Sequence, residues 1–204
     1  MLLIGRDLSP FVRRSAALAL LLGLEFERKI VNTEDDADFI RRYNPLGRVP
    51  VLVLGEDDVI VDSHAIVDHL LSVGDPEARV LPATGPARRA ALRHSSIAIG
   101  VMEKTVAAAY ERIRRPEAYY YAPWAERLQA QICAGLEALD EALGDREWFG
   151  GQAPGLADID AVVAFGHVGI VAREARDAWG LTRLAGLAER SEGVPALRET
   201  RWRG

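Results

Sequence analysis

The stretch from residue 2 to residue 31, LLIGRDLSPFVRRSAALALLLGLEFERKIV, decides the fold of the first part of the chain. Residues 2–4 form a short apolar run, long enough for a buried strand. Ser9-Pro10 places a capping residue before a proline at the first helical position, and apolar residues then recur at helical spacing until Gly23. Residues 26–31 alternate apolar and charged side chains, which is typical of a strand. The stretch therefore predicts a βαβ unit whose two strands are parallel.

The residues that follow extend this unit into a mixed α/β domain. Residues 35–42 form a short helix candidate, and the runs 51–54 and 59–61 are rich in β-forming residues. Four polar residues separate these two runs, which predicts a hairpin. Asp62-Ser63 then begins another helix that carries apolar residues on one face. The expected order of elements is β-α-β-α-β-β-α.

The composition changes after residue 74, where glycine and proline become frequent, as in a linker. Farther along, apolar residues recur at helical spacing and no strand pattern returns. We therefore expect an α/β domain at 1–74, a linker at 75–87 and an all-helical domain at 88–204.

Composition and charge exclude several classes of protein. The 204 residues are 49% hydrophobic and 27% charged, which suits a globular protein and not a largely disordered one. The formal charge of −5 gives no sign of the basic face that a general nucleic-acid partner requires. The apolar run 18–24 is too short to span a bilayer, so we expect a cytoplasmic protein without a membrane partner.

The cysteine and histidine residues give no pattern for a metal. A single cysteine, Cys133, excludes an intramolecular disulfide and a cysteine-rich zinc site. The four histidines include no pair at i, i+4 spacing. The sequence therefore predicts no metal site.

Three interruptions of regular structure carry residue types suited to ligand binding. A Ser9 hydroxyl at a helix N-terminus favours a bound anion such as a thiolate, although capping alone accounts for Ser9-Pro10. Val49-Pro50 stands before a strand, where a cis bond would turn the backbone of Val49 toward a ligand and a trans bond would be an ordinary strand start. Asp62-Ser63 matches a zwitterionic amino-acid head, and again capping is the alternative.

Taken together and in order, these motifs resemble the glutathione transferase superfamily, and the Ser-Pro-Phe form is most similar to bacterial serine-type members. The matching stretches are residues 8–14 (LSPFVRR), 44–52 (NPLGRVPVL), 62–66 (DSHAI) and 155–160 (GLADID). The resemblance covers essentially the whole chain. It implies an α/β plus all-α protein, in which a thioredoxin-like N-terminal domain is followed by an all-helical C-terminal domain.

The resemblance also implies how glutathione would bind. Ser9 would be the catalytic residue, with its hydroxyl bonded to the glutathione thiolate. The backbone of Val49 would pair with the cysteinyl part, and Asp62 with Ser63 would hold the γ-glutamyl head. Arg48 lies where several members place a basic or amide side chain near the glycyl carboxylate.

Two further residues, Phe11 and Tyr110, would face the second substrate in a pocket between the domains. Two departures from the family pattern stand out. Asp62 is one methylene shorter than the more usual glutamate, which can weaken the grip on the head group. Gly155 takes the place of a Ser or Thr cap before Asp158, which bears on folding and not on the site.

The function implied by the resemblance is a cytosolic glutathione S-transferase that conjugates glutathione to small apolar electrophiles, as in detoxification. The expected partners are glutathione, the electrophile and a second copy of the chain in a homodimer. One alternative is a non-catalytic interaction protein on the same scaffold. Another is a glutathione-dependent thiol oxidoreductase or peroxidase, which would need a cysteine at the position of Ser9.

Overall fold

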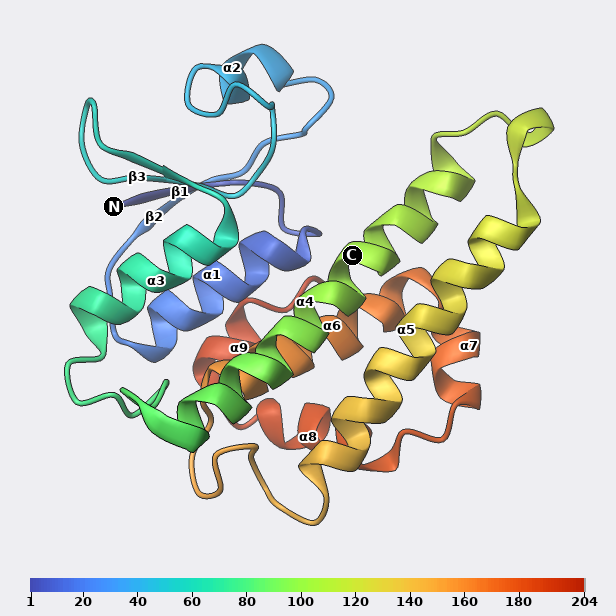
Figure 1. Cartoon of the computed structure of the whole chain (residues 1–204). Coiled ribbons are helices and arrows are strands. Elements are labelled where there is room, and N and C mark those ends of the chain that lie inside the picture. The colour runs from blue at the N-terminus through green and yellow to red at the C-terminus, as the bar shows by residue number, and fades with distance from the viewer. Residues whose placement is uncertain (204) are drawn as a thin grey trace. The chain divides into compact units, whose positions relative to one another are not determined.

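A four-stranded sheet with the strand order β2-β1-β3-β4 organises the first part of the chain (Figure 1). The strands are β1 (Leu2–Ile4), β2 (Glu27–Lys29), β3 (Val51–Val53) and β4 (Val59–Val61). β1 is parallel to β2 and antiparallel to β3, and β3 and β4 form an antiparallel hairpin. The predicted βαβ unit and hairpin are therefore confirmed. This computed structural model describes residues 1–203.

The two faces of the sheet pack against different helices. α1 (Pro10–Leu21) and α3 (Ser63–Gly74) lie side by side on one face, whereas the short helix α2 (Ala37–Arg41) packs on the other (Figure 1). Leu3 and Leu52 point toward α1 and α3, while their neighbours Ile4 and Val51 join the cluster around α2. This alternation is the period-2 pattern of strand side chains.

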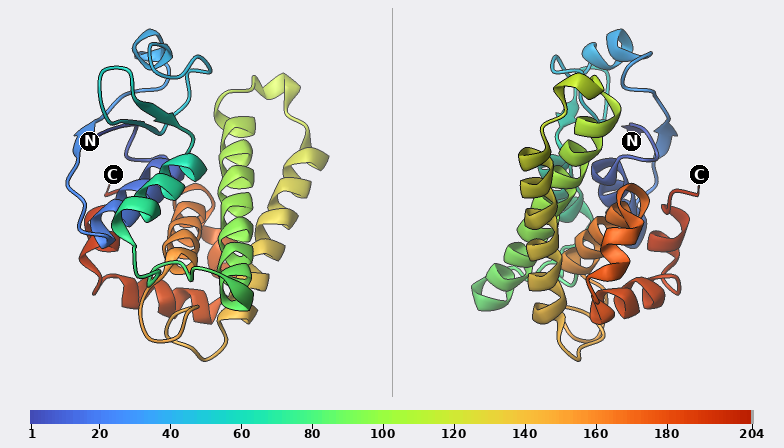
Figure 2. Two further views of the ribbon diagram at one scale, coloured as in Figure 1. Left: turned by 60° about the vertical axis from the view of Figure 1, so that its left-hand side comes forward. Right: turned by 90° about the vertical axis from the view of Figure 1, so that its right-hand side faces the viewer.

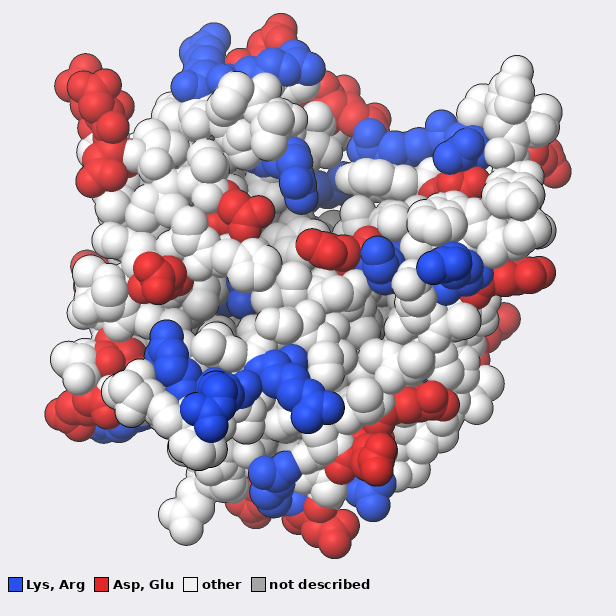
Figure 3. Space-filling view, viewed as in Figure 1, with Lys and Arg blue, Asp and Glu red and all other residues white. Residues whose placement is uncertain are grey.

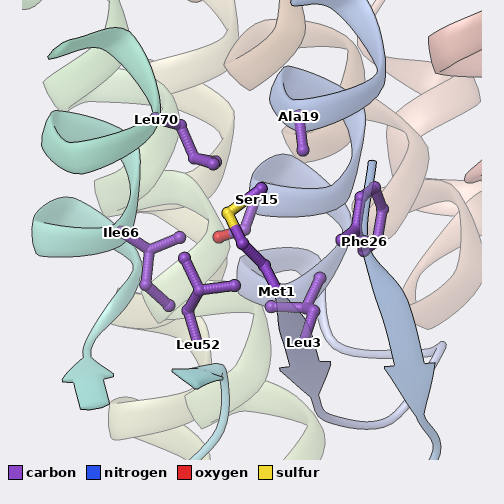
Figure 4. A pocket seen from close by; sticks show the side chains of 8 residues that line it. All are labelled: Met1, Leu3, Ser15, Ala19, Phe26, Leu52, Ile66 and Leu70. Atoms are coloured by element: carbon purple, nitrogen blue, oxygen red, sulfur yellow. The ribbon is translucent and has the colours of Figure 1, made fainter. Parts of the chain in front are cut away.

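Figure 4 shows the core between the sheet and the two long helices. Its residues are Met1, Leu3, Ser15, Ala19, Phe26, Leu52, Ile66 and Leu70. The space left between these side chains is too small for a water molecule. Such close packing holds α1 and α3 in fixed positions on the sheet.

Helix α1 begins and ends where the sequence indicates. The Ser9 hydroxyl caps the helix by accepting a hydrogen bond from the Val12 amide at 3.4 Å, and Pro10 is the first helical residue. Gly23 follows the helix with φ of +68°, a conformation that glycine adopts without strain. The predicted cap is thus present.

The chain divides into two units, of which the first is discontinuous. Residues 1–81 and 192–204 make up unit 1, and residues 82–191 make up unit 2. The last segment belongs to unit 1 because α9 (Pro195–Glu199) packs on α1, and Arg13 Nη2 donates a hydrogen bond to the Leu197 carbonyl at 3.3 Å. The sequence pattern showed only that this segment is helical, so it was expected with the helical domain.

Unit 2 is helical throughout its described elements. They are α4 (Gly85–Ile113), the 3-10 turn η1 (Glu117–Tyr119), α5 (Ala122–Leu143), α6 (Leu156–Val171), α7 (Arg173–Ala178) and α8 (Thr182–Ser191). α4 packs along both α5 and α6, and Figure 2 shows α4 and α5 as antiparallel neighbours joined through η1. α6 is buried along almost its whole length. The expected fold class, a thioredoxin-like domain with a helical remainder, is confirmed.

Charged side chains are spread over the surface. Figure 3 shows acidic and basic groups interspersed on the face that it presents. The sequence holds 25 basic and 30 acidic residues. Within residues 1–203, no helix combines the length and the apolar character that a membrane crossing requires.

The start of α6 is organised by a buried carboxylate. Asp158 is fully buried and accepts hydrogen bonds from the backbone amides of Phe149 at 2.8 Å and Gly155 at 2.9 Å. Burial raises the pKa of Asp158 to about 6, although these bonds and the charge of Arg146 act in the opposite direction. Gly155, which has no side-chain cap to offer, is therefore tied into the helix start by Asp158.

This carboxylate should make stability depend on pH. A folded-state pKa of about 6 lies above the ordinary 3.8, so the stability that the proton contributes is complete below 3.8 and is lost as the pH rises through 6. We expect Asp158→Asn to remove up to about 3 kcal/mol of that pH dependence. Urea unfolding of both proteins between pH 4 and 7 measures the difference, with the exposed Asp145→Asn as the control. If the free energy of unfolding depends on pH equally in the parent and in Asp158→Asn, the raised pKa of Asp158 is contradicted.

Candidate functional site

The strand register brings the three predicted motifs to one end of the sheet. Ile4, Val51 and Val61 are direct partners across β1, β3 and β4, and neighbouring strands lie about 5 Å apart. The chain leaves β1 after Ile4, enters β3 before Val51 and leaves β4 after Val61. The loop to Ser9, the Val49-Pro50 bond and the Asp62-Ser63 pair therefore all emerge at the same end.

Ser9 presents an unused donor at the N-terminus of α1. Its side-chain oxygen accepts the bond from Val12, but no group within residues 1–203 accepts its hydroxyl proton. The residue is partly exposed. The amide of Phe11 in the first turn also lacks a partner in this range, and the helix dipole favours negative charge here. The arrangement can donate hydrogen bonds to an anion.

The Val49-Pro50 peptide bond is cis. In the described part of the chain, the backbone N–H and C=O of Val49 make no hydrogen bond. The preceding loop is held by Asn44, which is buried and bonds the Arg48 carbonyl at 3.0 Å and the Leu46 amide at 3.1 Å. Asn44 was not singled out from the sequence beyond its place in a turn, yet it fixes the loop that delivers Val49.

Asp62 combines an unusual backbone conformation with a charged side chain. Its φ of +74° and ψ of 139° lie in a region that residues other than glycine rarely adopt, and such outliers concentrate at functional sites. The carboxylate accepts bonds from the His64 amide at 2.9 Å and from His64 Nδ1 at 3.1 Å. Burial alone would raise the pKa of Asp62, but the bonds and charge of His64, together with Arg48, lower it overall. Asp62 is therefore ionised at neutral pH and half exposed.

Ser63 follows as the first residue of α3 and is almost completely buried. Arg14, a buried residue of α1, donates hydrogen bonds from Nη1 to the Ser63 carbonyl and to the Ser63 hydroxyl, both at 3.1 Å. Arg14 was not among the residues predicted for the site. The available signal was its position one helical turn before Leu18, on the face that α1 buries.

The remaining predicted residues are distributed between the two units. Arg48 is exposed near Asp62, while Phe11 is partly buried in the first turn of α1. Tyr110 belongs to unit 2, is 40% exposed, and lies under the Arg114 guanidinium at 4.2 Å. The roles expected of Arg48, Phe11 and Tyr110 stay predictions.

The described residues hold no group of three or more metal-ligating side chains. Cys133 lies in α5 of unit 2 and is partly exposed. The candidate site therefore consists of hydroxyl, carboxylate and backbone groups. It can bind an anion at α1 and a group carrying both charges at the start of α3.

Comparison with known proteins gives one family. The family model described as "Glutathione S-transferase, N-terminal domain" matches residues 3–77. A probable glutathione S-transferase of Glycine max is 31% identical over 170 residues, which are 80% of this chain and 69% of that protein. The maleylacetoacetate isomerase of Pseudomonas aeruginosa is 29% identical over 192 residues, which are 90% of this chain and 86% of that protein.

A solved structure agrees with these sequence relatives. The crystal structure of a glutathione S-transferase from Methylobacterium radiotolerans, in complex with glutathione sulfonate, has a TM-score of 0.91 to this chain at 30% identity. The match covers 100% of this chain and 95% of that one.

The contact between Asp62 and His64 can be tested directly. We expect His64→Ala to raise the pKa of Asp62, because it removes the ring bond and the ring charge while keeping the backbone amide bond. A pH titration of the Asp62 carboxyl by carbon-13 NMR measures the change. His69→Ala in the same helix serves as the control and should leave the titration unchanged. If the titration of Asp62 is the same in His64→Ala as in the parent, His64 does not lower the pKa of Asp62.

Proposed function

The chain belongs to the glutathione S-transferase superfamily, and on this basis we propose that the end of the sheet where its three motifs meet binds glutathione. The shared register of Ile4, Val51 and Val61 is the observation that carries the proposal. It gives one peptide-sized ligand simultaneous access to the start of α1, the cis bond and the start of α3.

Each part of glutathione has a chemical match among these groups. The ionised Asp62 carboxylate suits the glutamyl ammonium, and the amide and hydroxyl of Ser63 suit the glutamyl carboxylate. The unused backbone groups of Val49 suit the cysteinyl peptide unit. Arg48 is the cation proposed for the glycyl carboxylate. This placement brings the thiol of glutathione next to the Ser9 hydroxyl.

We infer that Ser9 is the catalytic residue and acts by stabilising the thiolate. A hydrogen bond to a charged group contributes about 1.5–3 kcal/mol, which corresponds to a thiol pKa lower by roughly 1–2 units. The dipole of α1 adds a smaller effect of the same sign. With an activated aryl chloride, the sulfur forms the new carbon–sulfur bond and chloride leaves with the electron pair of the broken carbon–chlorine bond.

The second substrate is proposed to be a small apolar electrophile that meets Phe11 and Tyr110, as in cytoplasmic detoxification. The isomerase relative supports a second candidate function, glutathione-dependent isomerisation. Both activities require the same thiolate, but a transferase consumes glutathione and an isomerase regenerates it. Measuring glutathione consumption for each substrate tested therefore separates the two activities.

The experiment that tests the function is the pH–rate profile of Ser9→Ala with glutathione and an aryl chloride. We expect about a tenfold lower rate near neutral pH, and a smaller loss above the ordinary thiol pKa of about 8.5, where solution supplies the thiolate. Ser9→Thr retains both hydroxyl and cap and should keep most of the rate.

The loss of the cap requires its own control, because it costs about 0.5–2 kcal/mol of stability. Ser15→Ala removes another hydroxyl bond in the same helix, from Ser15 to the Phe11 carbonyl at 3.0 Å. Rates are compared only on folded proteins. If Ser9→Ala shows the same pH–rate profile as the parent, Ser9 has only a capping role. If the parent does not bind glutathione, the non-catalytic alternative is favoured.

We also propose that the protein is a homodimer in which α3 and α4 supply the contact surface. Exposed apolar residues on these helices, Val73 and Leu92, support this choice. Sedimentation equilibrium should give a species of about twice the chain mass of 22.3 kDa at micromolar concentration, and Leu92→Glu should shift it toward the monomer. A single species at the chain mass in the parent would contradict the proposal.

A further inference from the structure

Arg14 is a fully buried arginine that touches the residue proposed to hold the glutamyl carboxylate. It comes from the second turn of α1, and Ser63 begins α3, so the contact joins two helices that are 49 residues apart in the sequence. A single nitrogen, Nη1, lies 3.1 Å from both the carbonyl oxygen and the hydroxyl oxygen of Ser63. That nitrogen carries two hydrogens, one for each oxygen.

The donor and acceptor roles in this contact are fixed by chemistry. A guanidinium can only donate, so the Ser63 hydroxyl accepts from Arg14 through one of its lone pairs. The hydroxyl proton must then point to a different acceptor. Throughout the described residues, no such acceptor is present for the Ser63 hydroxyl, and the Ser63 backbone amide also has no partner.

Two unused donors on one buried residue are unusual, because buried polar groups are almost always hydrogen-bonded. Ser63 is only 2% exposed, so it is one of the buried residues to which this rule applies. In the described part of the chain, both bonds from His64 go to Oδ1 of the neighbouring Asp62 carboxylate, and no bond joins that carboxylate to Ser63. The start of α3 therefore offers a pair of donors to an acceptor that comes from outside the chain.

We propose that Arg14 is a positioning residue that holds the Ser63 hydroxyl in its donor orientation and thereby makes the start of α3 selective for a carboxylate. The inference rests on the proposed function, since the carboxylate in question is that of the glutamyl head. An amide in the same place has one acceptor oxygen where a carboxylate has two, and it turns an N–H group toward one of the two donors of Ser63. Arg14 therefore affects which head group is accepted, without touching the ligand.

The test compares two ligands: glutathione, and its analogue in which the glutamyl α-carboxylate is an amide. Calorimetry or fluorescence quenching gives the affinity of each for the parent, Arg14→Lys and Ser63→Ala. We expect the parent to prefer glutathione by about ten- to a hundredfold, the range for hydrogen bonds to a charged group. Arg14→Lys should reduce this preference by about tenfold, because a rotating ammonium does not hold both oxygens of Ser63 as the planar guanidinium does.

The matched control is Arg13→Lys. Arg13 is the neighbour of Arg14 in α1, but its guanidinium bonds the Leu197 carbonyl and does not contact Ser63. This variant should keep the preference of the parent. The double variant Arg14→Lys/Ser63→Ala should show the same preference as Ser63→Ala alone, because Arg14 acts through the hydroxyl that Ser63→Ala removes.

Each outcome decides between the two proposals. A parent that binds neither ligand overturns the proposed function. A parent that prefers glutathione, with Arg14→Lys and Arg13→Lys equally selective, overturns the role of Arg14. If Arg14→Lys does not fold, Ser63→Ala remains informative, because an undiminished preference in that variant shows that the hydroxyl is not the donor.

Discussion

The alignment of Ile4, Val51 and Val61 across three strands is the constraint on which the rest of the structure depends. Leu3 and Leu52 face α1 and α3, and Ile4 and Val51 face α2, so both faces of the sheet are buried. A slip of one residue would exchange these two sets and displace the connected loops by about 3.3 Å. The packing of the apolar core therefore determines where the loops that carry Ser9, Val49 and Asp62 lie.

Two helix starts illustrate how differently the chain treats its backbone donors. At α6, the buried carboxylate of Asp158 accepts two backbone amides and closes the helix start. At α3, the Asp62 carboxylate accepts the His64 amide and Arg14 donates to the carbonyl and hydroxyl of Ser63, while the two donors of Ser63 have no partner among the described residues. The start of α6 is thus closed by a carboxylate of the chain itself. The start of α3, beside the buried cation of Arg14, keeps two donors for a ligand of negative charge.

Much of the fold was predictable because its signals are local. The cap at Ser9, the alternation in the strands and the polar turn of the hairpin each act over a few residues, and all were recognised. The contact of Arg14 with Ser63 and the return of α9 to α1 were not predicted, since they join residues far apart in the sequence. The β2 strand was predicted longer than it is, because its alternation continues beyond Glu27–Lys29, where pairing with β1 stops. The cis state of the Val49-Pro50 bond is not predictable from the sequence, since the dipeptide is the same in both isomers.

The discontinuity of unit 1 has a consequence for the synthesis of the chain. Residues 1–81 leave the ribosome long before α9, which completes the packing against α1. At roughly 5–20 residues per second, the intervening stretch of about 110 residues takes on the order of 6–22 s to make. During that interval the face of α1 that α9 later covers is exposed to the cellular environment. The packing of unit 1 can therefore be completed only after all of unit 2 has been synthesised.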